Sequence, residues 1–169
     1  MQIFLTGMMG CGKSFWGKKI AETHQMPFFD LDTYIEQKAN KTITEIFAQQ
    51  GEPYFRALEH RYLKEVIENN PSFILATGGG TPCFYHNMTI MKTAGTVCYL
   101  KVDIPILVKR ISHLNKRPLI VGIEINALND QLLALYLDRK KIYGQSDHMI
   151  DMNQIDETTF AENFIKNYV

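Results

Sequence analysis

The chain has 169 residues, of which 46% are apolar and 21% charged, and its formal net charge at pH 7 is zero. This is the composition of one soluble domain that is large enough to bury a core without disulfides or structural metals. A zero net charge argues against a nucleic-acid or membrane surface, and no apolar run is long enough to span a bilayer. Three cysteines without metal-ligand spacing indicate reduced thiols and predict a cytoplasmic protein.

Apolar runs typical of strands alternate along the chain with stretches of helical periodicity. We predict strands at about residues 2–6, 27–30, 72–76, 96–101 and 147–150. The predicted helices cover about residues 13–25, 32–39, 43–50, 53–69, 85–94, 104–114, 126–144 and 157–168. Strands separated by helices imply right-handed crossovers and a parallel sheet. The predicted fold is therefore α/β and three-layered, a single domain over residues 1–169 with a five-stranded parallel sheet covered by helices on both faces.

Several helix ends carry their own local signals. Thr42 and Glu45 have the spacing of a capping box at the start of the third predicted helix. Pro53 and Pro105 each suit the first turn of a helix, where the missing N–H is not needed. Asp156 is predicted to cap the last helix.

The most specific motif is the run from Gly7 to Ser14, which reads GMMGCGKS between the first predicted strand and the first predicted helix. This is the phosphate-binding loop (P-loop) G-x-x-x-x-G-K-[ST] in the context that it requires. Its glycines let successive N–H groups point into one hollow, and the helix adds the positive end of its dipole. Lys13 can then reach the β- and γ-phosphates, and the Ser14 hydroxyl can bind Mg²⁺. The motif predicts nucleoside triphosphate binding, and its early start leaves no room for a secretory signal.

Polar residues follow three predicted strands, at the edge where an open parallel sheet binds its ligands. Asp30 and Asp32 end the second strand, a triple glycine at residues 78–80 follows the third, and the fifth runs into residues 151–154. Either aspartate alone could simply cap the next helix, but both together beside a triphosphate favour metal and acceptor chemistry. Three consecutive glycines indicate a backbone that a ligand approaches closely.

The arginines are few, five against thirteen lysines, and the arginine fork suits bidentate capture of carboxylate or phosphate. Arg56 lies on a predicted helix with Glu59 three residues later as an orienting partner, and Arg139 lies on the long helix near the C-terminus. Arg61 is assigned to a solvated face. Taken singly, each of these arginines also fits an ordinary surface or ion-pair role.

Residues 113–125 interrupt the helical pattern. Pro118 disfavours helix at Arg117, the residue before it, and Gly122 loosens the segment further. We predict a mobile lid here that carries Arg117. Arg110 lies near the end of the helix that precedes it.

As a set, these motifs resemble the shikimate kinase family, in the nucleoside-monophosphate-kinase-like group of P-loop proteins. The resemblance covers essentially the whole chain, with the motifs in the same order. The P-loop alone is shared by many families, whereas the combination with the other motifs is far more restrictive. The motifs are Gly7 to Ser14, Asp30-Leu31-Asp32, Gly51-Glu52 leading to Phe55-Arg56 with Glu59, Thr77 to Gly80, Arg117-Pro118-Leu119, and Arg139.

The resemblance implies a P-loop kinase that transfers the γ-phosphoryl of ATP to the 3-hydroxyl of shikimate, in aromatic amino-acid biosynthesis. It also implies a monomer, one Mg²⁺ bound with ATP, and an acceptor-binding helical segment at about residues 32–60. The ATP-binding residues would be Gly10, Cys11, Gly12, Lys13, Ser14, Phe15, Arg110, Arg117 and Gln154. The shikimate-binding residues would be Asp32, Arg56, Gly79 and Arg139. The catalytic residues would be Lys13, Asp32 and Arg117, and the metal residues Ser14 and, through water, Asp30.

Two alternatives are open at this stage. One is another small-molecule kinase on the same scaffold, such as a gluconate or nucleoside-monophosphate kinase, although a nucleotide acceptor would call for more arginines along the lid. The other is a nucleotide-binding regulator without turnover. The regulator is disfavoured by the presence of Asp32, Arg56, Gly79 and Arg139 together, since a switch protein has no reason to keep a carboxylate clamp.

Overall fold

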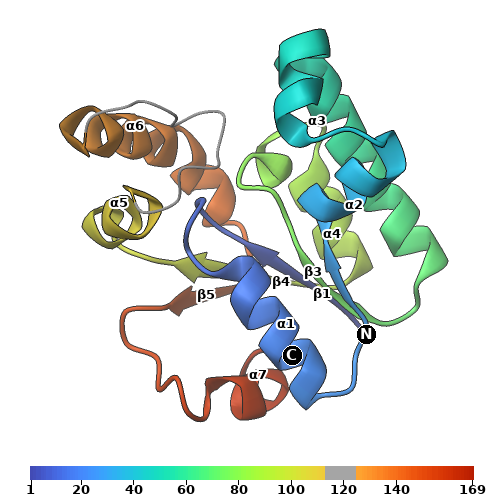
Figure 1. Ribbon diagram of the computed structural model, residues 1–169. Coiled ribbons are helices and arrows are strands. Elements are labelled where there is room, and N and C mark those ends of the chain that lie inside the picture. Colours follow the sequence, from blue (N-terminus) through green and yellow to red (C-terminus); the bar gives the residue numbers. More distant parts are fainter. Residues whose placement is uncertain (113–124) are drawn as a thin grey trace.

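The computed structural model describes residues 1–112 and 125–169, and its five strands form one parallel sheet in the order β2-β3-β1-β4-β5 (Figure 1). Because Ile3 of β1 is in register with Ile74 on one side and Thr96 on the other, β1 is the central strand. The predicted α/β fold and all five strands are confirmed, each strand to within one residue at either end. The strands are β1 (Gln2–Thr6), β2 (Phe28–Asp30), β3 (Phe73–Ala76), β4 (Thr96–Lys101) and β5 (His148–Asp151).

Helices cover both faces of this sheet, as predicted (Figure 1). None of the described helices combines the length and apolar character needed to cross a bilayer. They are α1 (Lys13–Thr23), α2 (Leu31–Ala39), α3 (Ile43–Asn69), α4 (Asn87–Ala94), α5 (Ile104–Ser112), α6 (Ile125–Tyr143) and α7 (Phe160–Tyr168), with a short 3₁₀ helix η1 (Thr81–Cys83).

Alternate side chains of the central strands build two apolar cores. Ile3 and Leu5 of β1 pack on the face covered by α1, α5, α6 and α7, whereas Phe4 packs on the face covered by α2, α3 and α4. Neighbouring β3 alternates in the same way, with Ile74 on the first face and Leu75 on the second. Because these strands are buried on both faces, their sequences are continuous apolar runs.

The predicted capping box is present, because Thr42 Oγ1 accepts from the N–H of Glu45 and the Glu45 carboxylate accepts from the N–H of Thr42. The two predicted helices that follow are joined into α3 across a kink at Gly51, whose φ of 77° and ψ of 174° are not helical. Pro53 therefore stands in the first turn after the kink, and Pro105 in the first turn of α5. The local signals at these ends predicted their geometry correctly.

Two helix starts differ from prediction. Helix α4 begins at Asn87 rather than 85, because Tyr85 and His86 adopt left-handed φ values of 51° and 57°. Helix α7 begins at Phe160 rather than 157. The prediction that Asp156 caps this helix is wrong, since its carboxylate instead accepts hydrogen bonds from Thr158 and Thr159 in the turn that precedes the helix.

Candidate active site

The P-loop connects β1 to α1 at the carboxyl edge of the sheet. Gly12 is the N-cap of α1 and has a φ of 100°, and Gly10 has a φ of 78°, so both occupy backbone conformations that favour glycine. A Cβ on Gly10 would also lie 2.8 Å from Ile111 Cγ1. The loop is therefore closed tightly against α5, and it leads directly into the N-terminus of α1, where N–H groups can bind an anion.

Lys13 is the charged residue of this loop, and its side chain is buried. Its ammonium group donates to the carbonyl oxygens of Gly7 and Met8, both at 2.9 Å, and lies 3.7 Å from Cys11 Sγ. The loop carbonyls hold the cation inside the P-loop, next to the N–H groups that can bind phosphate.

Ser14 and Asp30 lie in contact across the carboxyl ends of β1 and β2. The Ser14 hydroxyl donates to Asp30 Oδ2, while Asp30 Oδ1 accepts from the N–H of Thr33 at 3.3 Å and so caps α2. One carboxylate oxygen of Asp30 therefore caps the helix, and the other faces the P-loop. A hydroxyl and a carboxylate at one point are the hard oxygen donors that suit Mg²⁺.

A pocket of about 480 Å³ opens above the P-loop. Arg110 borders it and donates from Nη1 to the carbonyl of Gly10 at 3.4 Å, while the ring of Phe15 is 66% exposed and packs edge-on against Trp16. The pocket is lined by Gly10, Gly12, Lys13, Ser14, Phe15, Trp16, Asp30, Asp32, Thr77, Gly78, Gly79, Arg110 and Glu157.

Two of the predicted ATP-binding residues do not line this pocket. Cys11 is buried within the loop, at 1% exposure, and Gln154 is an exposed residue whose N–H donates to the carbonyl of Asp151 at 3.1 Å. Glu157, which the sequence did not single out, lines the pocket instead. The segment after β5 carries Glu157 to this pocket, and Lys19 Nζ of α1 donates to the Glu157 carbonyl at 3.3 Å.

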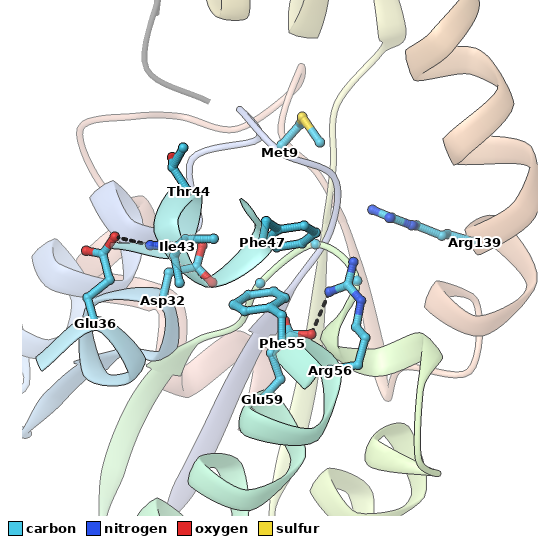
Figure 2. A pocket seen from close by; sticks show the side chains of 13 residues that line it. Met9, Asp32, Glu36, Ile43, Thr44, Phe47, Phe55, Arg56, Glu59 and Arg139 are labelled. Atoms are coloured by element: carbon cyan, nitrogen blue, oxygen red, sulfur yellow. Dashed lines mark hydrogen bonds and ion pairs between the residues drawn. The ribbon is translucent and has the colours of Figure 1, made fainter. Parts of the chain in front are cut away.

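A second pocket, of about 240 Å³, lies beside the first. Figure 2 shows the side chains of Arg56 and Arg139 entering it from two different elements, α3 and α6. The rings of Phe47 and Phe55 form an apolar wall. The full lining is Met9, Asp32, Glu36, Ile43, Thr44, Phe47, Phe55, Arg56, Glu59, Gly78, Gly79, Gly80 and Arg139.

Arg56 is held rigidly at this pocket. Its Nη1 lies 2.5 Å from Glu59 Oε2, and its Nε and Nη2 lie 3.0 and 2.8 Å from Glu52 Oε1. The ring of Phe84 stacks 4.6 Å from the guanidinium carbon. Burial by itself would lower the pKa of Arg56, but the two glutamates outweigh it and raise that pKa. The predicted partner Glu59 is confirmed, whereas Glu52 and Phe84 were not foreseen as partners.

Glu59 is itself fully buried and joins Arg56 to the triple glycine at residues 78–80, called the glycine loop below. Burial raises the pKa of Glu59, and the ion pair with Arg56 and the hydrogen bond from Thr81 act in the opposite direction. A Cβ on Gly80 would lie 2.5 Å from Arg56 Nη1, and one on Gly79 would lie 3.4 Å from Arg139 Nη1. A side chain at Gly80 would therefore displace the Arg56 guanidinium group, whereas at Gly79 it would only touch Arg139.

The two pockets share three lining residues, Asp32, Gly78 and Gly79. Asp32 lies in the first turn of α2, and its Oδ1 is buried. A carboxylate therefore stands at the junction between the phosphate-binding loop and the arginine-lined pocket. The arrangement suits transfer of a phosphoryl group from a nucleotide in one pocket to a hydroxyl group in the other.

The remaining arginines separate into two groups. Arg61 is exposed on α3, as predicted. Arg117 and the predicted lid, except for the last residue of the lid, lie outside the described residues, so the role of Arg117 stays a prediction.

Tyr143 was not predicted from the sequence as a site residue, although its hydroxyl donates to the carbonyl of Gly79 at 2.5 Å. Its spacing of four residues from Arg139 on α6 was the available signal.

Known proteins are similar to this chain along almost its whole length. A family model described as shikimate kinase matches residues 9–168. The chain is 36% identical to a shikimate kinase of Azobacteroides pseudotrichonymphae over 97% of both chains. It is 39% identical to one of Flavobacterium johnsoniae over 93% of this chain and 94% of the relative.

Solved structures agree with this result. The crystal structure of shikimate kinase from Bacteroides thetaiotaomicron has a TM-score of 0.89 at 36% identity, covering 98% of this chain and 94% of that one. Shikimate kinase from Acinetobacter baumannii, in complex with shikimate, has a TM-score of 0.89 at 31% identity, covering 98% and 90%. Similarity of this extent in sequence and in fold shows that the chain belongs to the shikimate kinase family of ATP-dependent kinases.

Proposed function

We propose that the protein transfers the γ-phosphoryl of ATP to the 3-hydroxyl of shikimate, with ATP in the larger pocket and shikimate in the smaller one. The observation that carries this proposal is the junction of the two pockets at Asp32 and the glycine loop. Phosphoryl transfer needs chiefly in-line positioning and neutralisation of charge. Two pockets that meet at one carboxylate provide the positioning, and the P-loop provides cationic and N–H groups on the donor side.

The smaller pocket suits a small acid that carries hydroxyl groups. Arg56 and Arg139 present two guanidinium forks, which bind a carboxylate bidentately. The walls formed by Phe47 and Phe55 suit the carbon ring of the acceptor. The relative from Acinetobacter baumannii was solved in complex with shikimate, which has this chemistry. We therefore assign Arg56 and Arg139 to the carboxylate, and Asp32 and the Gly79 backbone to the hydroxyl side.

Mg²⁺ fits the oxygen pair of Ser14 and Asp30, and when bound it would neutralise charge on the β- and γ-phosphates. The Ser14 hydroxyl would be a direct ligand, and Asp30 would act through a bound water molecule. Lys13 would move from the carbonyls of Gly7 and Met8 to the phosphates, and Arg117, outside the described residues, would neutralise the phosphoryl group during transfer.

Asp32 is proposed as the general base. As the 3-hydroxyl attacks the γ-phosphorus, its proton passes to the Asp32 carboxylate, while the bond from the γ-phosphorus to the bridging oxygen breaks and ADP leaves. The described lining residues of both pockets belong to one chain, which supports the proposal that the protein acts as a monomer. We also propose a cytoplasmic location, where ATP is available and thiols stay reduced.

The acceptor assignment is tested with a coupled assay of ADP release on a panel of acceptors. We expect turnover with shikimate in the presence of Mg²⁺ and ATP, and only background rates with gluconate or nucleoside monophosphates. The physical reason is that the paired arginines and the apolar walls match a cyclic carboxylic acid. Faster turnover with gluconate or a nucleotide would contradict the assignment of the smaller pocket to shikimate.

Arg139→Lys should raise the KM for shikimate by about tenfold or more, because lysine keeps the charge but loses the bidentate fork. The KM for ATP should change much less, since Arg139 lines only the smaller pocket. Steady-state kinetics in both substrates measures the difference. Arg61→Lys, the same change at an exposed arginine, is the matched control. If Arg139→Lys weakened only ATP, the carboxylate clamp would be assigned wrongly.

A further inference from the structure

The glycine loop after β3 needs anchors, because glycine peptides rotate more freely than any others. Two of its three carbonyl groups are held locally, by backbone hydrogen bonds of η1. The N–H of Thr81 donates to the Gly78 carbonyl at 3.2 Å, and the N–H of Cys83 donates to the Gly80 carbonyl at 2.9 Å. The middle carbonyl, that of Gly79, is held instead by a side chain from another part of the chain.

That side chain is Tyr143, at the end of α6. Its hydroxyl donates to the Gly79 carbonyl at 2.5 Å, and the hydroxyl oxygen lies 3.7 Å from Met8 Sδ of the P-loop. Tyr143 is fully buried, and its ring stacks on Tyr99 of β4 with centroids 5.0 Å apart. Burial raises its pKa far above the ordinary value, so the phenol stays protonated and remains a donor.

Tyr143 also lies one helical turn after Arg139, so both side chains project from the same face of α6. A Cβ on Gly79 would lie 3.4 Å from Arg139 Nη1 and 3.5 Å from the N–H nitrogen of Met9. Gly79 is therefore enclosed between the P-loop and Arg139. One turn of helix thus carries both the guanidinium group and the hydroxyl that orients the adjacent peptide.

We propose that Tyr143 is a positioning residue for the acceptor. It fixes the orientation of the Gly79 peptide and the position of that peptide relative to Arg139. Holding the Gly79 oxygen restricts the rotation of Gly79 about its Cα–C bond. In a trans peptide the carbonyl and the following N–H point in opposite directions, so the same bond directs the Gly80 N–H away from Tyr143. Without this anchor the Gly79 peptide samples several orientations, and the shikimate must select one of them. The proposal rests on the assignment of Gly79 and Arg139 to shikimate made above.

Tyr143→Phe tests the proposal because it removes only the hydroxyl. We expect the KM for shikimate to rise about fivefold, the value of one ordinary hydrogen bond, with the KM for ATP unchanged. In ¹⁵N-glycine-labelled protein, the amide signals of the glycine loop should shift or broaden. Tyr99→Phe, the same change in the stacked neighbour, should alter neither. Incorporation of 4-aminophenylalanine at residue 143 restores a donor and should restore the KM.

The alternative outcomes are distinguishable. If Tyr143→Phe lowers the melting temperature but leaves the KM for shikimate unchanged, or raises both KM values equally, Tyr143 is only structural and the proposal is overturned. Arg139→Lys is measured beside it. A raised KM for shikimate in Arg139→Lys alone rejects only the role of Tyr143, whereas no change in either variant rejects the acceptor site itself. If Tyr143→Phe does not fold, an unrestored KM in the 4-aminophenylalanine protein overturns the proposal.

Discussion

Lys13→Ala is expected to lower turnover by at least two orders of magnitude at saturating ATP and shikimate. The ammonium group is buried in the P-loop, 2.9 Å from two loop carbonyls, where a bound triphosphate would meet it. Loss of one preorganised charged contact to the transition state typically costs about 3 kcal/mol or more, which is roughly a hundredfold in rate. The measurement is kcat in a coupled assay with both substrates saturating.

The fold should survive this change. Lys13 donates to the carbonyls of Gly7 and Met8 and lies near Cys11 Sγ, all within its own loop. Ile20 and Ala21 on α1 pack in the core independently of it. We expect a small decrease in melting temperature from the lost loop hydrogen bonds. Lys18→Ala, at an exposed position on the same helix, should leave turnover unchanged. Near-wild-type turnover in Lys13→Ala would contradict the mechanism proposed for this site.

Asp32→Asn should lower kcat by about two to four orders of magnitude, the usual contribution of a positioned general base. The change is nearly isosteric and keeps a polar group at the junction of the pockets, but an amide does not accept the proton of the attacking hydroxyl. The loss should therefore persist at saturating shikimate. Steady-state kinetics with shikimate varied at saturating ATP separates the effect on kcat from the effect on KM.

The matched control is Asp138→Asn, which makes the same chemical change at an exposed position beside Arg139. Its kinetics should equal those of the unmodified protein. An Asp32→Asn protein with unchanged kcat and a raised KM for shikimate would show that Asp32 binds the acceptor without taking its proton. That result would leave the acceptor pocket in its place but remove the general base from the proposed mechanism.

The strands and most helix boundaries could be predicted because their signals are local. The double burial of β1 and β3 makes them continuous apolar runs, and the capping box at Thr42 is a contact between residues three apart. Where prediction failed, the signal was ambiguous. Asp156 carries the side chain of a helix cap but bonds within a preceding turn, and the left-handed φ values of Tyr85 and His86 have no mark in the sequence.

The donor side of the site could likewise be read from the amino acids, since a P-loop is one continuous run whose glycines, lysine and serine are adjacent in the chain. Its closed geometry around Gly12 and Lys13 depends on bonds within that run. The acceptor side could be predicted only as a set of separate residues with a family resemblance. Nothing local joins Arg56 to Arg139, because they lie on α3 and α6, far apart in the sequence.

Only the folded chain brings these groups together. The strand order puts β3 beside β1, so the glycine loop lies next to the P-loop and Asp32 borders both pockets. The anchors that orient the acceptor groups, Glu52 for Arg56 and Tyr143 for the Gly79 carbonyl, are contacts of single side-chain atoms. Sequence periodicity predicts which face of an element is buried, but not which atoms contact that face. These contacts are decided by the packing of α3 and α6 against the sheet, so the sequence pattern does not predict them.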